Sequence, residues 1–161
     1  MRLYLLRHGI AEDVRPGLTD EQRQLTPEGA KKLREAMKLA RDAGVRPTMI
    51  LTSPLLRAVQ TAEIAASELN YKGDLVYTES LTPDSRLEDV WQEIRTHSEQ
   101  EELLLSSHNP LCSMLAPFLL GAPELNVDYK KGAMMRIDLG SFGVRPRGVL
   151  RWFFSPSVAG A

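Results

Sequence analysis

Short runs of apolar residues, rich in Leu, Ile and Val, alternate along the chain with longer segments in which apolar residues recur every three or four positions. Runs of the first kind are typical of strands buried on both faces of a sheet, and segments of the second kind are typical of the helices that cover it. The pattern predicts strands over residues 2–7, 48–52, 74–78, 102–106, 133–139 and 148–154. The linker of residues 141–147 (SFGVRPR) is short enough for an antiparallel connection between the last two. We therefore expect an α/β fold, a three-layer α/β/α sandwich with a mostly parallel central sheet and an antiparallel C-terminal strand.

Proline marks the predicted start of three helices. A side chain that can cap a helix precedes proline at Thr26–Pro27, Ser53–Pro54 and Asn109–Pro110. Proline suits the first helical position because the N–H that it lacks would have no partner inside the helix. A fourth helix is predicted to begin near Ser85, which can form a capping box with Glu88, and Gly44 is expected to end the first helix.

Polar residues follow several of the predicted strands at the point where each strand ends. They are Arg7, His8, Ser53, Ser107 and His108. In an open parallel sheet, the carboxyl ends of the strands form the edge at which ligands bind. We therefore expect these residues to line one site.

The residues at this edge favour a phosphoryl group as the ligand. Arg57 lies in the first turn of the second predicted helix and Arg7 ends the first strand, so two guanidinium groups could bind one phosphoryl group. His8 and His108 add two imidazoles, and an imidazole can act as the nucleophile in phosphoryl transfer. Gly9 would let the backbone approach the ligand without a Cβ in the way.

Other chemistries fit the sequence less well. A zinc site made of His8, His108 and Cys112 is conceivable, but no H-E-x-x-H or C-x-x-C pattern is present and the nearby arginines would repel a cation. We therefore expect no metal. There is no Walker loop and no G-x-G-x-x-G motif, so no nucleotide cofactor is expected either. The cysteine-phosphatase loop is also absent, because Phe118 stands where an arginine would follow Cys112.

Four motifs resemble those of the histidine phosphatase superfamily, which also contains cofactor-dependent phosphoglycerate mutase. They are RHG at residues 7–9, LTPEG at 25–29, SPLLRAVQTA at 53–62 and SH at 107–108, in the family's order. Together they span most of the chain up to about Gly121. The short length, the RHGIAE beginning, the ESLTP stretch at 79–83 and the absence of a large inserted helical region resemble the phosphohistidine phosphatases of the SixA type.

The resemblance implies a phosphoglycerate mutase-like fold and assigns roles to the site residues. His8 would be the phosphorylated nucleophile, while Arg7, Arg57 and His108 would form the phosphate pocket with Gly9 beside them. It also implies that neither a metal nor another cofactor takes part.

One departure from the broader family bears on the substrate. Many members place a glutamate as proton donor in an E-x-L-x-E segment, whereas this chain has Glu79 at the first position and Pro83 at the last. General acid catalysis typically contributes about 10²- to 10⁴-fold, so ordinary phosphate esters should be poor substrates without it. A phosphoramidate needs less help, because its P–N bond is labile once the nitrogen is protonated. His108, Glu79 or Asp84 could supply that proton, and the sequence does not choose among them.

The favoured prediction is therefore a phosphatase that hydrolyses phosphohistidine on proteins through a covalent phosphohistidine intermediate. One alternative is a phosphatase of the same superfamily for small phosphate esters. The other is a phosphoprotein-binding module that holds phosphate without turnover.

Composition adds further expectations. The 161 residues, 43% of them hydrophobic, are expected to form a single domain over residues 1–161. A formal net charge of -1 favours neither nucleic acid nor a membrane surface as a partner, and a single cysteine suits a reducing compartment. No apolar stretch is long enough for a signal peptide or a membrane span. We expect a cytoplasmic monomer whose partner is a phosphohistidine-containing protein.

Several residues are expected to have no part in the site. Cys112 and Trp91 should pack in the core, and His97 should lie on a solvated helix face. Arg15 and Arg23 should lie in a solvated loop, and residues 155–161 should form a frayed tail.

Overall fold

A six-stranded sheet forms the centre of the protein. The computed structural model describes residues 1–156, so residues 157–161 of the predicted tail lie outside the described residues. The strands are β1 (Arg2–Arg7), β2 (Met49–Thr52), β3 (Leu75–Tyr77), β4 (Glu102–Ser107), β5 (Met134–Asp138) and β6 (Val149–Phe154), and their order in the sheet is β3-β2-β4-β1-β5-β6. The first four are parallel to one another, and β5 runs antiparallel to both of its neighbours. The predicted strands, and the predicted antiparallel pairing of the last two, are confirmed.

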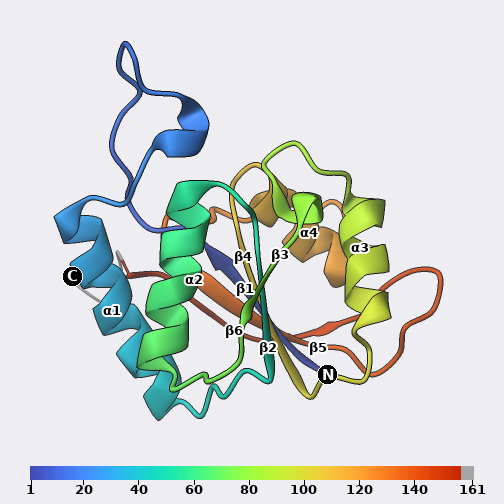
Figure 1. Ribbon diagram of the computed structural model, residues 1–161. Helices are drawn as coiled ribbons and strands as arrows, with labels where there is room; N and C mark the ends of the chain where they lie inside the picture. Colours follow the sequence, from blue (N-terminus) through green and yellow to red (C-terminus); the bar gives the residue numbers. More distant parts are fainter. Residues whose placement is uncertain (157–161) are drawn as a thin grey trace.

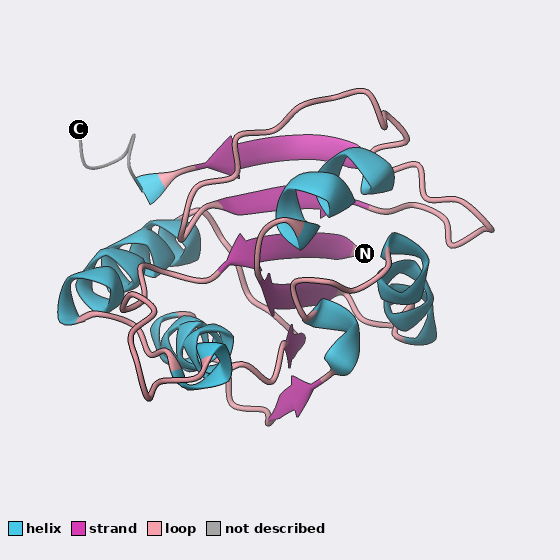
Figure 2. Ribbon diagram, turned by 90° about the horizontal axis from the view of Figure 1, so that it is seen from above, coloured by secondary structure: helices cyan, strands magenta, loops and turns pink. Residues whose placement is uncertain are grey.

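Helices cover both faces of the sheet (Figures 1 and 2). Helices α1 (Pro27–Asp42) and α2 (Leu56–Glu68) pack on one face, and α3 (Leu87–Thr96) and α4 (Leu111–Leu119) pack on the other. Two short 3-10 helices, η1 (Asp20–Gln22) and η2 (Glu79–Leu81), lie in the connections. The arrangement confirms the predicted three-layer α/β/α sandwich. None of the helices in the described part is long and apolar enough to cross a bilayer.

Strand β1 shows why its apolar run is unbroken. Leu3 and Leu5 pack in the core beneath α3 and α4, while Tyr4 and Leu6 pack in the core beneath α1 and α2. Because successive side chains of a strand point to opposite faces, a strand covered on both sides must be apolar at every position. Cys112 and Trp91 are buried in the first of these cores, as predicted.

The predicted limits of α1 are confirmed. Thr26 caps the helix by accepting a hydrogen bond from the Gly29 N–H over 2.9 Å, and Pro27 is its first residue. Gly44 follows the end of the helix with a φ of 92°, a left-handed conformation that glycine adopts without strain.

The other predicted helix starts are displaced. Helix α2 begins at Leu56 rather than Pro54, α4 at Leu111 rather than Pro110, and α3 at Leu87 rather than next to Ser85. The hydroxyls of two of the predicted capping residues are used elsewhere: Ser53 binds the His108 ring and Ser85 donates to the Glu79 carbonyl. The predicted capping box of Ser85 is therefore wrong.

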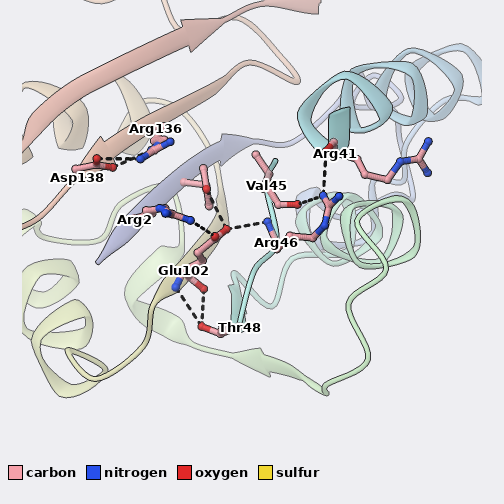
Figure 3. A network of polar contacts seen from close by, with 9 residues as sticks. Arg2, Arg41, Val45, Arg46, Thr48, Glu102, Arg136 and Asp138 are labelled. Atoms are coloured by element: carbon pink, nitrogen blue, oxygen red, sulfur yellow. Dashed lines mark hydrogen bonds and ion pairs between the residues drawn. The ribbon is translucent and has the colours of Figure 1, made fainter. Parts of the chain in front are cut away.

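A buried polar cluster holds the amino end of β4 (Figure 3). Glu102 is only 5% exposed, and its carboxylate accepts hydrogen bonds from Arg2 Nη1, the Tyr4 hydroxyl and the Arg46 backbone N–H over 2.7, 3.0 and 2.7 Å. Burial, followed by the Glu102 carboxylate, raises the pKa of Tyr4, so its hydroxyl remains a donor. The cluster lies at the opposite end of β4 from His108.

We expect the Glu102→Ala substitution to lower the free energy of unfolding by about 2 kcal/mol, because it leaves the buried Tyr4 hydroxyl without its acceptor and removes the two part-buried bonds from Arg2 and Arg46. Urea unfolding measures the change. Glu101→Ala is the matched control. The Glu101 carboxylate is next in the chain to Glu102, but it is exposed and makes no ion pair in the described part of the chain. A loss of the same size in both variants would contradict the role given to the cluster.

Candidate active site

Two histidines meet at the carboxyl ends of adjacent strands. His8 follows β1 and His108 follows β4, and the His8 N–H donates to the Ser107 carbonyl over 2.9 Å. The ring centroids are 5.1 Å apart, and the residues are 5% and 1% exposed. Two residues one hundred positions apart in the chain thus form one buried pair. This agrees with the expectation that residues at the strand ends come together at one edge of the sheet.

Hydrogen bonds indicate which nitrogen of each ring is protonated. His8 Nδ1 lies 2.7 Å from the Gly9 carbonyl oxygen, which can only accept, so Nδ1 carries the proton and Nε2 keeps its lone pair. His108 Nε2 lies 2.8 Å from Ser53 Oγ, which itself accepts from the Leu55 N–H. In the described part the Ser53 hydroxyl has no acceptor other than Nε2, so we assign its proton to this bond and the proton of His108 to Nδ1.

The two arginines are held by backbone carbonyls and one carboxylate. Arg7 Nη1 donates to the Tyr129 carbonyl over 2.7 Å. Arg57, the second residue of α2, is 4% exposed; its Nη1 donates to the Asp20 carbonyl over 2.8 Å and its Nη2 to the Asp20 carboxylate over 3.1 Å. Asp20 also accepts from Arg23 Nη1 over 2.8 Å. Both terminal nitrogens of Arg57 are thus bound to Asp20.

Three buried nitrogens in the described part have no hydrogen-bond partner: Arg7 Nε, Arg57 Nε and His108 Nδ1. Buried polar atoms are nearly always paired, so each unpaired one requires an explanation. All three belong to the predicted phosphate pocket and can donate. The charges of both arginines also act on both histidine rings, which indicates that the four side chains surround one region. An anion with several acceptor oxygens would satisfy all three nitrogens.

Burial keeps both imidazoles uncharged. It is the main cause that lowers the pKa of His8 to about 3, and Arg57, Arg7 and Lys131 lower it further against the opposing Gly9 bond. Burial also lowers the pKa of His108 to about 3, with His8 and Arg57 acting in the same direction and Asp20 opposing them. His8 Nε2 therefore has a free lone pair at neutral pH.

The phosphate-free protein should show this directly in an NMR titration. We expect the ring nitrogens of His8 and His108 to keep their neutral shifts from pH 8 to pH 5. Since the unfolded chain binds these protons near pH 6.5 and the folded protein near pH 3, the free energy of unfolding should fall as the pH drops through that window. A ring that titrates near pH 6.5 would contradict the assigned burial.

The remaining predicted site residues are placed differently. Gly9 donates its N–H to Thr61 Oγ1 over 3.1 Å and lies next to the pocket. Glu79 and Asp84, the predicted proton donors, are exposed in and just after η2, and neither side chain contacts a site histidine in the described part. Segment η2 does lie near the site, because Ser107 Oγ donates to the Leu81 carbonyl.

Sequence reasoning missed Asp20 and misjudged two other residues. Asp20 lies in a long excursion between β1 and α1 that projects from the body of the protein (Figure 1). Arg23 was expected to be solvated, but its side chain is 18% exposed and is paired with Asp20. His97 is also partly buried, with a side chain 21% exposed beside Glu93. The D-x-x-R spacing at residues 20–23 is the signal that could have singled out Asp20.

The chain is similar in sequence and in fold to known proteins. The family model of the histidine phosphatase superfamily (branch 1) matches residues 3–82. An uncharacterized protein of Picosynechococcus sp. is 37% identical over 145 residues, which cover 88% of this chain and 87% of that protein. Phosphohistidine phosphatase SixA of Escherichia coli is 28% identical over 158 residues, which cover 97% of this chain and 94% of that one.

The solved structure of a protein histidine phosphatase SixA complexed with tungstate superimposes with a TM-score of 0.87 at 25% identity, and the match covers 99% of both chains. The agreement therefore extends beyond the motifs to the full set of strands and helices. The chain belongs to the histidine phosphatase superfamily, and it is similar to the SixA proteins over nearly its whole length.

Proposed function

We propose that the protein hydrolyses phosphohistidine on other proteins through a phosphorylated His8. The observation that supports this most directly is that three buried nitrogens without partners, Arg7 Nε, Arg57 Nε and His108 Nδ1, belong to the residues that act electrostatically on a neutral His8 or pack against its ring. A site that only bound phosphate would not need an uncharged nucleophile within its ring of donors.

The proposed reaction has two displacements. His8 Nε2 attacks phosphorus, a P–N bond to His8 forms, and the P–N bond of the substrate breaks as its imidazole nitrogen takes up a proton. Water then attacks the phosphorus of phospho-His8, which releases inorganic phosphate and restores the imidazole. Splitting one displacement into two is the usual gain from a covalent intermediate.

The surrounding residues would act on charge and position. Arg7 and Arg57 bind the phosphoryl oxygens, and His108 Nδ1 donates a further hydrogen bond to them. Because these donors are already in place before the substrate arrives, little reorganisation is needed as negative charge spreads over the oxygens in the transition state. Gly9 lines the groove next to the nucleophile, and a Cβ added there would face Leu25, Gly29 and Leu33 at ordinary contact distances.

The leaving nitrogen takes its proton from solvent. His108 is a neutral imidazole, and its remaining N–H is too weak an acid to be lost, so it serves as a hydrogen-bond donor to the phosphoryl oxygens. Glu79 and Asp84 are exposed and make no hydrogen bond or ion pair with either site histidine in residues 1–156. A phosphoramidate substrate suits a site without a strong general acid better than an alkyl phosphate does.

The relatives support the substrate class. One is named a phosphohistidine phosphatase, and another is described as complexed with tungstate, a tetrahedral oxyanion of the kind that the three donors would bind. The proposal includes no metal or cofactor, because two fixed guanidinium groups favour an anion over a cation. It also treats residues 1–161 as one cytoplasmic, monomeric domain.

A trapping experiment tests the proposal. The protein is mixed with a phosphohistidine peptide and quenched at alkaline pH, where P–N bonds persist. The residue that carries the transferred phosphoryl group, which is the label, is then located by mass spectrometry. We expect the label on His8 and a kcat/KM for the peptide at least tenfold above that for p-nitrophenyl phosphate. A label on another residue would refute the mechanism, and a preference for the ester would favour the small-ester alternative. Phosphate binding without any hydrolysis would favour the binding module.

A further inference from the structure

A groove with a volume of about 380 Å³ lies beside the nucleophile. Its walls include Arg7 and Gly9 from the nucleophile strand and its end, Lys32 from α1, and Lys130 and Lys131 from the loop before β5. None of the described residues that line it is acidic. The groove is thus locally basic in a protein whose formal net charge is -1.

The loop that carries the two lysines is fixed to the catalytic strand. The Gly132 N–H donates to the carbonyls of both Arg7 and His8, over 3.1 and 3.0 Å, and the Arg7 N–H donates to the Ala133 carbonyl over 3.0 Å. On the other side of the lysines, the Tyr129 carbonyl accepts from Arg7 Nη1 over 2.7 Å. Backbone contacts on both sides therefore hold Lys130 and Lys131 at the rim of the phosphate pocket.

One lysine of the groove has no ion pair within residues 1–156, and the ion pairs of the other two are exposed. Lys131 makes no ion pair within residues 1–156, and its charge helps to lower the pKa of His8. Lys32 lies 3.2 Å from Glu28 and Lys130 lies 3.0 Å from Asp128, but all four side chains are at least half exposed. Exposed pairs of this kind contribute little free energy and exchange readily.

We propose that this groove binds an acidic segment of the phosphorylated protein, next to its phosphohistidine. The inference rests on the proposed function and adds to it a partner chemistry: carboxylate side chains within a few residues of the modified histidine. The small volume suits a short stretch of polypeptide, and a formal net charge of -1 gives no reason to expect nucleic acid.

The experiment uses three phosphohistidine peptides that differ only in flanking residues, which are acidic, neutral or basic. With the unmodified enzyme at low salt, we expect kcat/KM to be at least tenfold higher for the acidic than for the basic peptide, and the difference to shrink as salt rises. Lys131→Gln should reduce this preference several-fold and Lys131→Glu should reverse it. The readout is the ratio of the rates on the acidic and basic peptides, because a general effect of Lys131→Gln on the nucleophile would change both rates by the same factor.

Lys31→Glu is the matched control, because this exposed neighbour of Lys32 on α1 does not line the groove. It should retain the preference, whereas Lys32→Glu should weaken it. Equal rates on all three peptides, or an unchanged preference in both Lys131 variants, would overturn the inference. If the enzyme hydrolyses none of the peptides, the proposed function fails instead. Binding of the unphosphorylated acidic peptide, measured by fluorescence anisotropy, then still decides whether the groove recognises it.

Discussion

The His8→Ala substitution is expected to abolish turnover of phosphohistidine substrates, with kcat lowered by at least about 10⁴-fold. The reason is that no other side chain in the site offers a free lone pair next to the unpaired donors: His108 uses Nε2 toward Ser53 and presents a proton at Nδ1. Release of phosphate in a single-turnover assay measures the change. Phosphate should still bind to this variant, because Arg7, Arg57 and His108 remain.

His97→Ala is the matched control for this experiment. It removes the one histidine outside the site, which follows the last residue of α3, and should leave kcat within about twofold of the parent. Comparable loss in both variants would point to a general effect of histidine removal. Substantial turnover by His8→Ala with a native circular dichroism spectrum would remove His8 from the mechanism.

The second large effect is expected at Arg57. Arg57→Ala should lower kcat/KM by about 10²- to 10³-fold, because each charge-assisted hydrogen bond to the phosphoryl oxygens contributes about 1.5 to 3 kcal/mol. Arg57→Lys should recover little of it, since an ammonium cannot bind Asp20 and phosphate at once with the geometry of a planar fork. The inhibition constant of inorganic phosphate should rise in parallel. An unchanged inhibition constant would place Arg57 outside the phosphate pocket.

Asp20 is expected to matter through Arg57. Its carbonyl and carboxylate hold Nη1 and Nη2 of the guanidinium, and Nε remains unpaired on another edge. Asp20→Ala should therefore lower kcat/KM by about tenfold in the parent and have almost no effect in the Arg57→Ala background. Glu21→Ala, which alters the next exposed residue of η1, is the control. A rise in activity in Asp20→Ala would instead mean that the carboxylate competes with phosphate for Arg57.

Much of the fold could be predicted because it depends on residues that are close together in the sequence. The unbroken apolar run of β1 reflects burial on both faces, and Thr26–Pro27 and Gly44 mark both ends of α1. The start of α2 was misplaced because Ser53, a good capping residue in isolation, gives its hydroxyl to a histidine 55 positions away. A capping preference worth about 1 kcal/mol is easily overridden by such a contact.

The same distinction applies to the site. His8, Arg57 and His108 could be singled out because each follows or begins a regular element, and strand ends of a parallel sheet meet at one edge. Asp20 could not, because it lies in an irregular excursion whose path depends on a contact with a residue 37 positions later. Glu79 and Asp84 were predicted as proton donors, but their carboxylates are exposed. Segment η2 contacts Ser107 through its backbone, and this contact does not bring the two carboxylates to the histidines.

The position of β4 between β1 and β2 also has a consequence for when the phosphate pocket can form during synthesis of the chain. Strand β4 is the fourth along the chain, yet it lies between the first two in the sheet, so β1 and β2 are joined only through their ladders with β4. His8, Ser53 and His108 therefore meet only when the chain has been made at least as far as His108. A nascent or truncated chain cannot bind phosphate in this pocket, and an oxyanion that binds it stabilises the completed fold alone.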